Sequence, residues 1–193
     1  MSRDVLETFN LDVLTWAPWL ERADETDLAP EQREQVVAVV GNSPIADYIA
    51  VLANDLPALK TRARVHVHHF TSNDPEPASY RELGATTASR INGCHFCASG
   101  HALMYAALSD KRDVAQRLMD DGVDADLPRL ERAIVELATK VTNDPESLSA
   151  ADFTRLRDLG FDDLGILDVI NYSAFFGNAT RLTLSLGEPK LRE

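Results

Sequence analysis

The stretch Cys94-His95-Phe96-Cys97-Ala98-Ser99-Gly100-His101 decides how this chain is interpreted. It contains both cysteines of the sequence, and His101 lies four residues after the second. The stretch lies within a helical pattern, in which positions i, i+3 and i+7 fall on one face. We therefore expect the two thiols and the imidazole to point the same way, an arrangement that favours thiol chemistry over incidental packing of sulfur.

Composition limits the classes of protein to consider. The chain has 193 residues, of which 45% are hydrophobic and 26% charged, so one domain with a sizeable core is expected. Its net charge of −12 argues against nucleic acid or an anionic membrane as a partner, because both attract cationic surfaces. No apolar run approaches the roughly 20 residues of a membrane span.

The expected compartment is the cytoplasm. The first seven residues include Asp4 and Glu7, where a signal peptide would have its apolar stretch. In a reducing compartment, a CxxC pair is expected to cycle between thiol and disulfide. A structural disulfide here has a weak rationale, since so short a loop constrains the unfolded chain little.

The sequence predicts an all-α protein. Residues 1–28 are expected to form an irregular N-terminal segment and residues 29–193 a single helical domain, without a strand. Turn residues and apolar periodicity predict helices over 30–41, 43–52, 57–70, 78–91, 94–108, 109–122, 128–141, 149–160 and 162–185. The last of these is apolar nearly all round, so it is expected to be buried in the core or in a subunit interface.

Several signals set the helix boundaries. Asn92-Gly93 is expected to break the chain between two helices, immediately before the cysteine helix. Ser109 is a candidate cap for the next helix. Ser149 is expected to form a capping box with Asp152.

The cysteine helix supports a defined chemistry. Its N-terminus favours thiolate over thiol at Cys94. His101 lies one turn beyond Cys97 and could accept the proton of that thiol, so that Cys97 attacks a peroxide or a disulfide and Cys94 closes the internal disulfide. Glu82, 12 residues before Cys94, is the acidic candidate to fix the tautomer of His101, if the break folds its helix back beside the cysteine helix.

Glu82, followed by Cys94-x-x-Cys97-x-x-x-His101, resembles the AhpD-like alkylhydroperoxidases of the carboxymuconolactone decarboxylase superfamily. The string Ser89-Arg90-Ile91-Asn92-Gly93-Cys94-His95-Phe96-Cys97 is typical of its peroxidase-related branch. The resemblance implies an AhpD-like helical bundle with the CxxC motif at a helix N-terminus, a homo-oligomer, and thiol-dependent reduction of hydroperoxides without a cofactor. In that family the second cysteine attacks, the first resolves it, and the histidine and glutamate form a proton relay; these positions are Cys97, Cys94, His101 and Glu82.

One position departs from the family pattern. The best-studied members have a histidine immediately before the second cysteine, where this chain has Phe96, and His95 lies one place earlier. One residue turns a helical side chain by about 100°. The participation of His95 in the relay is therefore an open question. The expected partners are a small hydroperoxide and an external dithiol or carrier-protein reductant.

Other functions remain open. A non-enzymatic redox sensor, or a metal-binding module that uses the same CxxCxxxH site, is the main alternative, with Glu82 or another histidine as fourth ligand. In a purely structural role, Cys94 and Cys97 would simply be buried as small hydrophobic side chains. Ring-opening or decarboxylating chemistry on a lactone is disfavoured, because the superfamily members with that activity generally lack the CxxC pair.

Several side chains outside the motif are secondary candidates. His66 and His69 share a helix face, but His66, His68 and His69 are more simply interpreted as exposed or interfacial residues than as metal ligands. Trp16 and Trp19 are expected in packing, in an interface or at a substrate entrance. Tyr80 and Tyr105 are candidates for the border of the thiol pocket.

Overall fold

The computed structural model describes residues 6–23, 28–31, 33–34, 47–70 and 75–191, without the side chains of 66–70 and 75–77. The longer helices of these ranges are α3 Leu56–Phe70, α4 Pro75–Ile91, α5 His95–Ser109, α6 Arg112–Asp121, α7 Arg129–Asn143 and α9 Asp163–Leu186. Shorter ones are α2 Asp47–Leu52, α8 Ala150–Asp158 and the 3₁₀ turns Ala53–Asp55, Gly122–Asp124 and Pro145–Ser147. The predicted helical fold is confirmed. The helix predicted over 30–41 and the start of the one over 43–52 lie largely outside the described residues.

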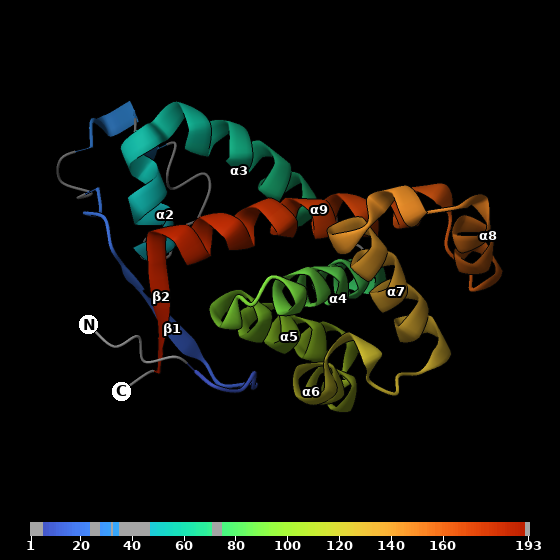
Figure 1. Ribbon diagram of the computed structural model, residues 1–193. Coiled ribbons are helices and arrows are strands. Elements are labelled where there is room, and N and C mark those ends of the chain that lie inside the picture. The colour runs from blue at the N-terminus through green and yellow to red at the C-terminus, as the bar shows by residue number, and fades with distance from the viewer. Residues whose placement is uncertain (1–5, 24–27, 32, 35–46, 71–74, 192–193) are drawn as a thin grey trace.

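Helix α4 is the centre of the bundle. It packs against α5, α7 and α9, and Figure 1 shows it running between them. Residues 81–89 are all buried, so α4 has no solvent face along this length. The hydroxyls of Thr86, Thr87 and Ser89 donate to carbonyls one turn back in the same helix, which satisfies them within the core.

The predicted break at Asn92-Gly93 is a helix end of the Schellman type. The amide of Gly93 donates to the Arg90 carbonyl at 3.3 Å and the amide of Cys94 to the Ser89 carbonyl at 3.0 Å. Gly93 has φ +78°, a left-handed conformation that glycine adopts without steric cost. Cys94, whose amide completes this motif, is also the N-cap of α5, so only Asn92, Gly93 and Cys94 separate the two helices.

The absence of strands was predicted wrongly. β1 Leu14–Pro18 pairs antiparallel with β2 Gly187–Leu191, with Trp16 opposite Pro189. Both strands contain a proline, which a two-stranded ribbon of edge strands tolerates but which hides the strand signal in the sequence. Trp16 is buried, and its indole N–H donates to the Thr183 carbonyl of α9 at 3.2 Å. The expected packing role of Trp16 is therefore observed, while Trp19 is half exposed.

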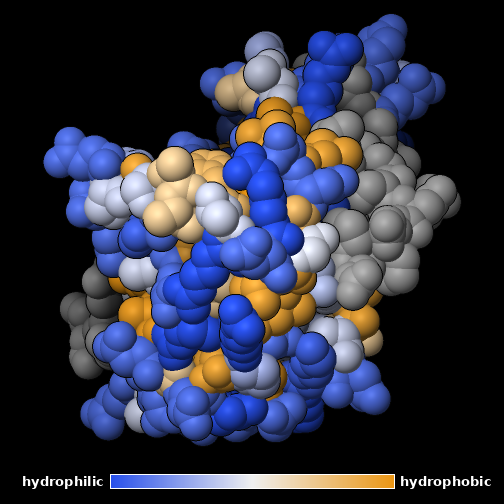
Figure 2. Space-filling view, turned by 90° about the vertical axis from the view of Figure 1, so that its right-hand side faces the viewer, coloured by the Kyte–Doolittle hydropathy of each residue, from blue (hydrophilic) through white to orange (hydrophobic). Residues whose placement is uncertain are grey.

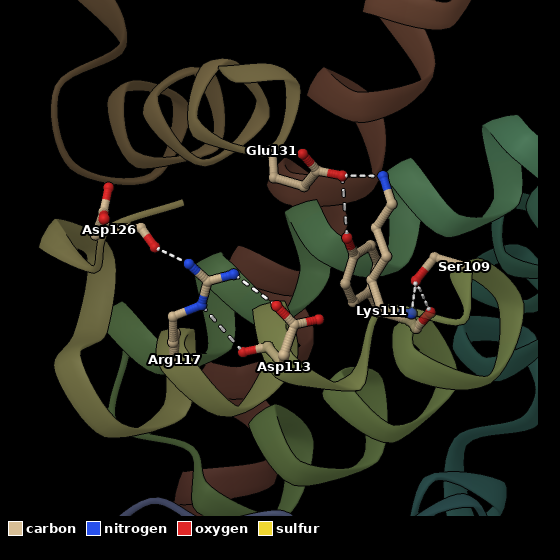
Figure 3. A network of polar contacts seen from close by, with 7 residues as sticks. Ser109, Lys111, Asp113, Arg117, Asp126 and Glu131 are labelled. Atoms are coloured by element: carbon tan, nitrogen blue, oxygen red, sulfur yellow. Dashed lines mark hydrogen bonds and ion pairs between the residues drawn. The ribbon is translucent and has the colours of Figure 1, made fainter. Parts of the chain in front are cut away.

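The predicted capping is right at one helix and wrong at another. Ser149 and Asp152 form the capping box of α8, and a hydrogen bond from Lys140, followed by one from the Ser149 amide, lowers the pKa of Asp152 to about 2. Ser109 is not the cap of α6, because α5 continues through it. Its hydroxyl donates to the Tyr105 carbonyl at 2.7 Å and accepts from the Lys111 amide (Figure 3).

Helix α9 has a buried face that runs from Ile166 to Thr183. Its opposite side, which includes Leu164, Leu167 and Arg181, is exposed in the single chain, so burial all round is not confirmed. At the end of the molecule where α8 lies, hydrophilic side chains cover most of the surface and hydrophobic ones form small separate areas (Figure 2). Within the described ranges, no helix combines the length and the apolar character needed to cross a bilayer.

Candidate active site

The two cysteines are joined as a disulfide at the start of α5. Cys94 is 1% exposed, and its sulfur accepts the amide hydrogen of Cys97 at 3.3 Å. Cys97 lies in the first turn of the helix and lines a cavity. The two sulfurs therefore differ in access, because only Cys97 is part of a cavity wall while Cys94 is sealed beneath it.

His101 is held by a buried carboxylate. Its Nδ1 lies 2.6 Å from Oε2 of Glu82, whose side chain is 4% exposed. The other oxygen of Glu82, Oε1, accepts the hydroxyl of Tyr172 on α9 at 3.1 Å. An ionised carboxylate only accepts hydrogen bonds, so this arrangement assigns the imidazole proton to Nδ1 and leaves Nε2 as the free basic nitrogen.

The surroundings of this triad of His101, Glu82 and Tyr172 are largely apolar. The His101 ring meets the Phe176 ring edge-on, with 3.9 Å between centroids, and Phe176 in turn contacts Tyr172 at 4.9 Å. Burial, and then the charge of Glu82, raises the pKa of Tyr172. Tyr172 therefore stays protonated at neutral pH and serves as a fixed hydrogen-bond donor to the carboxylate.

Close packing of α4 on α9 sets these distances. A Cβ at Gly84 would lie 2.7 Å from the Ser173 hydroxyl oxygen, so the helices approach more closely here than any larger residue would allow. An ion pair at 3.1 Å between buried Arg81 and Asp168 fixes the same two helices relative to one another. Glu82 and Tyr172 are each adjacent in sequence to this close-packed region, which explains why they meet.

The cavity beside Cys97 and His101 has a volume of about 460 Å³. Its walls come from α2, α3, α5 and α9, and from Val13 and Leu14 at the start of β1. Aliphatic and aromatic side chains dominate, among them Ile49, Leu59 and Phe175. A volume of this size suits a small organic molecule.

His95 lies outside this cavity. Its ring stacks on Phe9 with 3.9 Å between centroids and an interplanar angle of 15°, and its buried Nδ1 makes no hydrogen bond of normal length with the described residues. The guanidinium of Arg90 covers the same Phe9 ring at 3.9 Å. Burial lowers the pKa of His95; a hydrogen bond with the Thr8 backbone opposes this, and the charge of Arg90 adds to it. The one-residue shift of this histidine thus turns it toward the N-terminal segment and away from His101 and Glu82.

The structure moves two other candidates away from the site. Tyr80 packs against Phe161, with 5.0 Å between ring centroids, and Tyr105 lies beside Glu131 of α7. Neither tyrosine lines the cavity, so both candidates for its border were wrong. The tyrosine in the cavity wall is Tyr48. His66, His68 and His69 belong to α3, but their side chains lie outside the described set. In the part of the chain that the structure describes, no group of three or more metal-ligating side chains occurs.

Three further residues were missed in the sequence. Tyr172 lies in an apolar helix, where its polar hydroxyl was the signal that could have marked it. Arg62 and Tyr48 line the cavity from α3 and α2, far from the cysteine motif in sequence. Nothing in their local sequence distinguishes them from surface residues of amphipathic helices.

The fold is similar to that of known AhpD-like proteins. One is a crystal structure described as the alkylhydroperoxidase AhpD core, an uncharacterized peroxidase-related protein from Ralstonia eutropha JMP134, with a TM-score of 0.76 and 22% identity over 88% of this chain and 90% of the other. Another is an uncharacterized peroxidase-related protein from Silicibacter sp. TM1040, with a TM-score of 0.74 and 21% identity over 98% and 95% of the two chains. No protein-family model and no curated protein matches the sequence. The resemblance stated from the motif is thus confirmed at the level of the fold.

Proposed function

We propose that this protein, which shares the fold of the AhpD-like peroxidase-related proteins, is a thiol-dependent peroxidase that reduces organic hydroperoxides. The single observation that carries the proposal is the arrangement of Cys97 and His101 on one cavity wall, with His101 held by Glu82. The cavity provides space for a substrate, the imidazole provides a base, and the buried carboxylate provides its orientation.

The unequal access of the two sulfurs supports different roles for them. Cys97 lines the cavity, so a peroxide can reach it, whereas Cys94 is 1% exposed. Cys97 is therefore the attacking thiol and Cys94 the resolving one. Nε2 of His101 accepts the Cys97 proton, and the Glu82 carboxylate stabilises the imidazolium that forms.

The reaction balances in three steps. The Cys97 thiolate attacks one peroxide oxygen and the O–O bond breaks, which gives a sulfenic acid on Cys97 and an alcohol that takes up the proton held by His101. The Cys94 thiol then displaces water from the sulfenic acid and forms the Cys94–Cys97 disulfide. An external dithiol, either a small molecule or a carrier protein, reduces this disulfide and is itself oxidised to a disulfide.

The test is consumption of cumene hydroperoxide by the reduced protein in the presence of dihydrolipoamide. We expect wild type to turn over and Cys97→Ser to fall to the uncatalysed rate. Cys94→Ser is the matched control, because it keeps the attacking thiol: without the reductant, it should consume about one equivalent of peroxide and trap with a sulfenic-acid reagent. Equal rates for wild type and Cys97→Ser would contradict the proposal.

A further inference from the structure

The cavity beside Cys97 carries one permanent charge. Among the described residues that line it there is no Asp, Glu or Lys, and Arg62 is the only arginine. The chain as a whole has 31 acidic and 19 basic residues, so a cavity lined by a cation and no anion differs from the acidic average of the protein. The electrostatic character of the cavity is opposite to that of the molecule as a whole.

No carboxylate neutralises Arg62 within the described ranges. Its guanidinium lies 4.7 Å from the Phe175 ring centroid and 5.6 Å from that of Tyr48, and Nη1 donates to Oδ1 of Asn178 at 3.0 Å. These partners leave donors of the guanidinium without a protein acceptor, since the group has five N–H bonds. Arg81, which is more deeply buried than Arg62, by contrast forms an ion pair with Asp168.

A second polar group, the hydroxyl of Tyr48, lies on the residue next to the Arg62 guanidinium. The hydroxyl of Tyr48 is buried and makes no hydrogen bond of normal length with the described residues; its polar neighbour is the Thr183 hydroxyl, which already donates to the Ala179 carbonyl. Tyr48 lines the same cavity, and its ring is in contact with the guanidinium. A buried donor without an acceptor is costly, so the pair is matched to a ligand that brings oxygen acceptors. Burial lowers the pKa of Arg62 and raises that of Tyr48, in keeping with the low polarity of the cavity.

We propose that the cavity binds an apolar carboxylic acid, with the carboxylate on Arg62 and Tyr48 and the hydrocarbon along the apolar wall toward Cys97. This inference rests on the proposed function for its chemical meaning: the substrates would be hydroperoxides of apolar acids, with the peroxide group at Cys97. Guanidinium and phenol donors fit the two oxygens of a carboxylate, and the aliphatic walls fit a hydrocarbon. The carboxylate is unchanged by the reaction and serves to orient the substrate.

Binding can be tested without any peroxide chemistry. Decanoate and decanol share one hydrocarbon chain and differ in the carboxylate, and the oxidised wild-type protein, in which the disulfide is closed, is the receptor. Calorimetric titration should show that wild type prefers decanoate to decanol by about tenfold or more, the effect of one charge-assisted hydrogen bond. In Arg62→Met this preference should disappear.

Two further variants control the experiment. Arg129→Met removes an exposed arginine at the start of α7, away from the cavity, and should keep the wild-type preference. Tyr48→Phe keeps the ring that packs on Arg62 and removes only the hydroxyl, so it tests the site even where Arg62→Met fails to fold; it should reduce the preference for decanoate several-fold. No preference for decanoate in wild type, or the wild-type preference in both Arg62→Met and Tyr48→Phe, overturns the inference.

A kinetic arm separates this inference from the proposed function. The ratio of kcat/KM for a linoleic acid hydroperoxide to that for cumene hydroperoxide should fall about tenfold in Arg62→Met relative to wild type. A wild-type protein that binds decanoate selectively but reduces neither peroxide contradicts the proposed function and supports the acid site. A protein that reduces both peroxides with a ratio unaffected by Arg62→Met supports the function and contradicts the acid site.

Discussion

Two buried glutamates in this protein each meet a tyrosine hydroxyl, yet their third partners differ. Glu82 accepts from Tyr172 at 3.1 Å and holds His101 at 2.6 Å, beside the cavity. Glu131 lies 3.5 Å from the Tyr105 hydroxyl and 2.5 Å from Nζ of Lys111. The second pair is part of the polar network between α5, α6 and α7 shown in Figure 3.

The third partner decides what each carboxylate can do. Lys111 is 46% exposed, so its ammonium compensates the charge of Glu131 from the solvent side and ties α7 to the turn before α6. His101 is 12% exposed and has a second ring nitrogen, which can accept a proton while Nδ1 keeps its hydrogen bond to Glu82. A buried carboxylate with a lysine is thus a structural ion pair, and the same group with a histidine at a cavity is a candidate proton relay. Burial alone does not distinguish them.

The largest expected difference concerns reaction rate. Glu82→Gln should lower the rate of peroxide reduction about a hundredfold, because the amide no longer stabilises the imidazolium of His101. Glu131→Gln, the matched change at the structural pair, should leave the rate within about twofold when assayed well below its melting temperature. Steady-state kinetics on both variants checks this, and comparable losses of rate in the two would remove the distinction.

The next effect is on stability and should appear at the structural pair. Lys111→Met leaves Glu131 buried with only Tyr105 as a partner, which we expect to cost about 1–3 kcal/mol, less than for a fully buried pair because Lys111 is partly solvated. Urea denaturation measures the loss. A free energy of unfolding within 0.5 kcal/mol of wild type, on the order of an exposed ion pair, would show that the lysine is not needed to compensate this charge.

Removal of the two hydroxyls sharpens the comparison. Tyr172→Phe and Tyr105→Phe each delete a hydrogen-bond donor to a buried carboxylate, and each should reduce the free energy of unfolding by about 1 kcal/mol. Only Tyr172→Phe should also slow peroxide reduction, by several-fold, because Glu82 loses a partner that fixes its position under His101. Denaturation and kinetics on the same samples separate the two effects. Slower turnover in Tyr105→Phe would contradict the assignment.

The smallest effect is the response to alkaline pH. Burial and the adjacent glutamate raise the pKa of both Tyr105 and Tyr172. A folded-state pKa above the unfolded value of about 10 means that the stabilisation is complete below pH 10 and is lost as pH rises above it. The free energy of unfolding should therefore fall above pH 10, less steeply in either Tyr→Phe variant. Tyrosine absorbance should show that these two groups resist ionisation until the protein unfolds.

Much of the relay could be predicted because it depends on local spacing. Cys94, Cys97 and His101 fall on one helix face by periodicity, and Asn92-Gly93 is a strong signal for the tight turn that brings α4 back along α5. Glu82 was a candidate from its place one helix before the break, but a lone glutamate in a helix is a weak signal, and the family resemblance supplied most of the support for it. The helices α3 to α9 were predicted within a few residues, because turn residues and capping signals mark most of their ends.

The remaining features depend on tertiary contacts. Tyr172 is 90 residues from Glu82, and only the close packing at Gly84 brings them together. Ser109 resembles a cap locally, but its hydroxyl donates to the Tyr105 carbonyl within α5, and that helix ends one residue later at Asp110, which has a left-handed conformation. Arg62 and Tyr48 are distinguished by their place in the cavity wall and by the absence of a carboxylate partner among the described residues, neither of which a sequence pattern reports. The prolines of β1 and β2 weigh against strands, and the pairing depends on two segments from opposite ends of the described chain.

That pairing has a consequence for biosynthesis. Val13 and Leu14 form part of the cavity wall, and β1, which begins at Leu14, is held by β2 and by the Trp16 indole over Gly187, where a Cβ would overlap the ring. The cysteine helix leaves the ribosome long before Gly187–Leu191 do, since translation proceeds at about 5–20 residues per second. The two cysteines are therefore synthesised several seconds before β2 can pair with β1 and complete the cavity. During that interval the thiols are more accessible than in the folded protein.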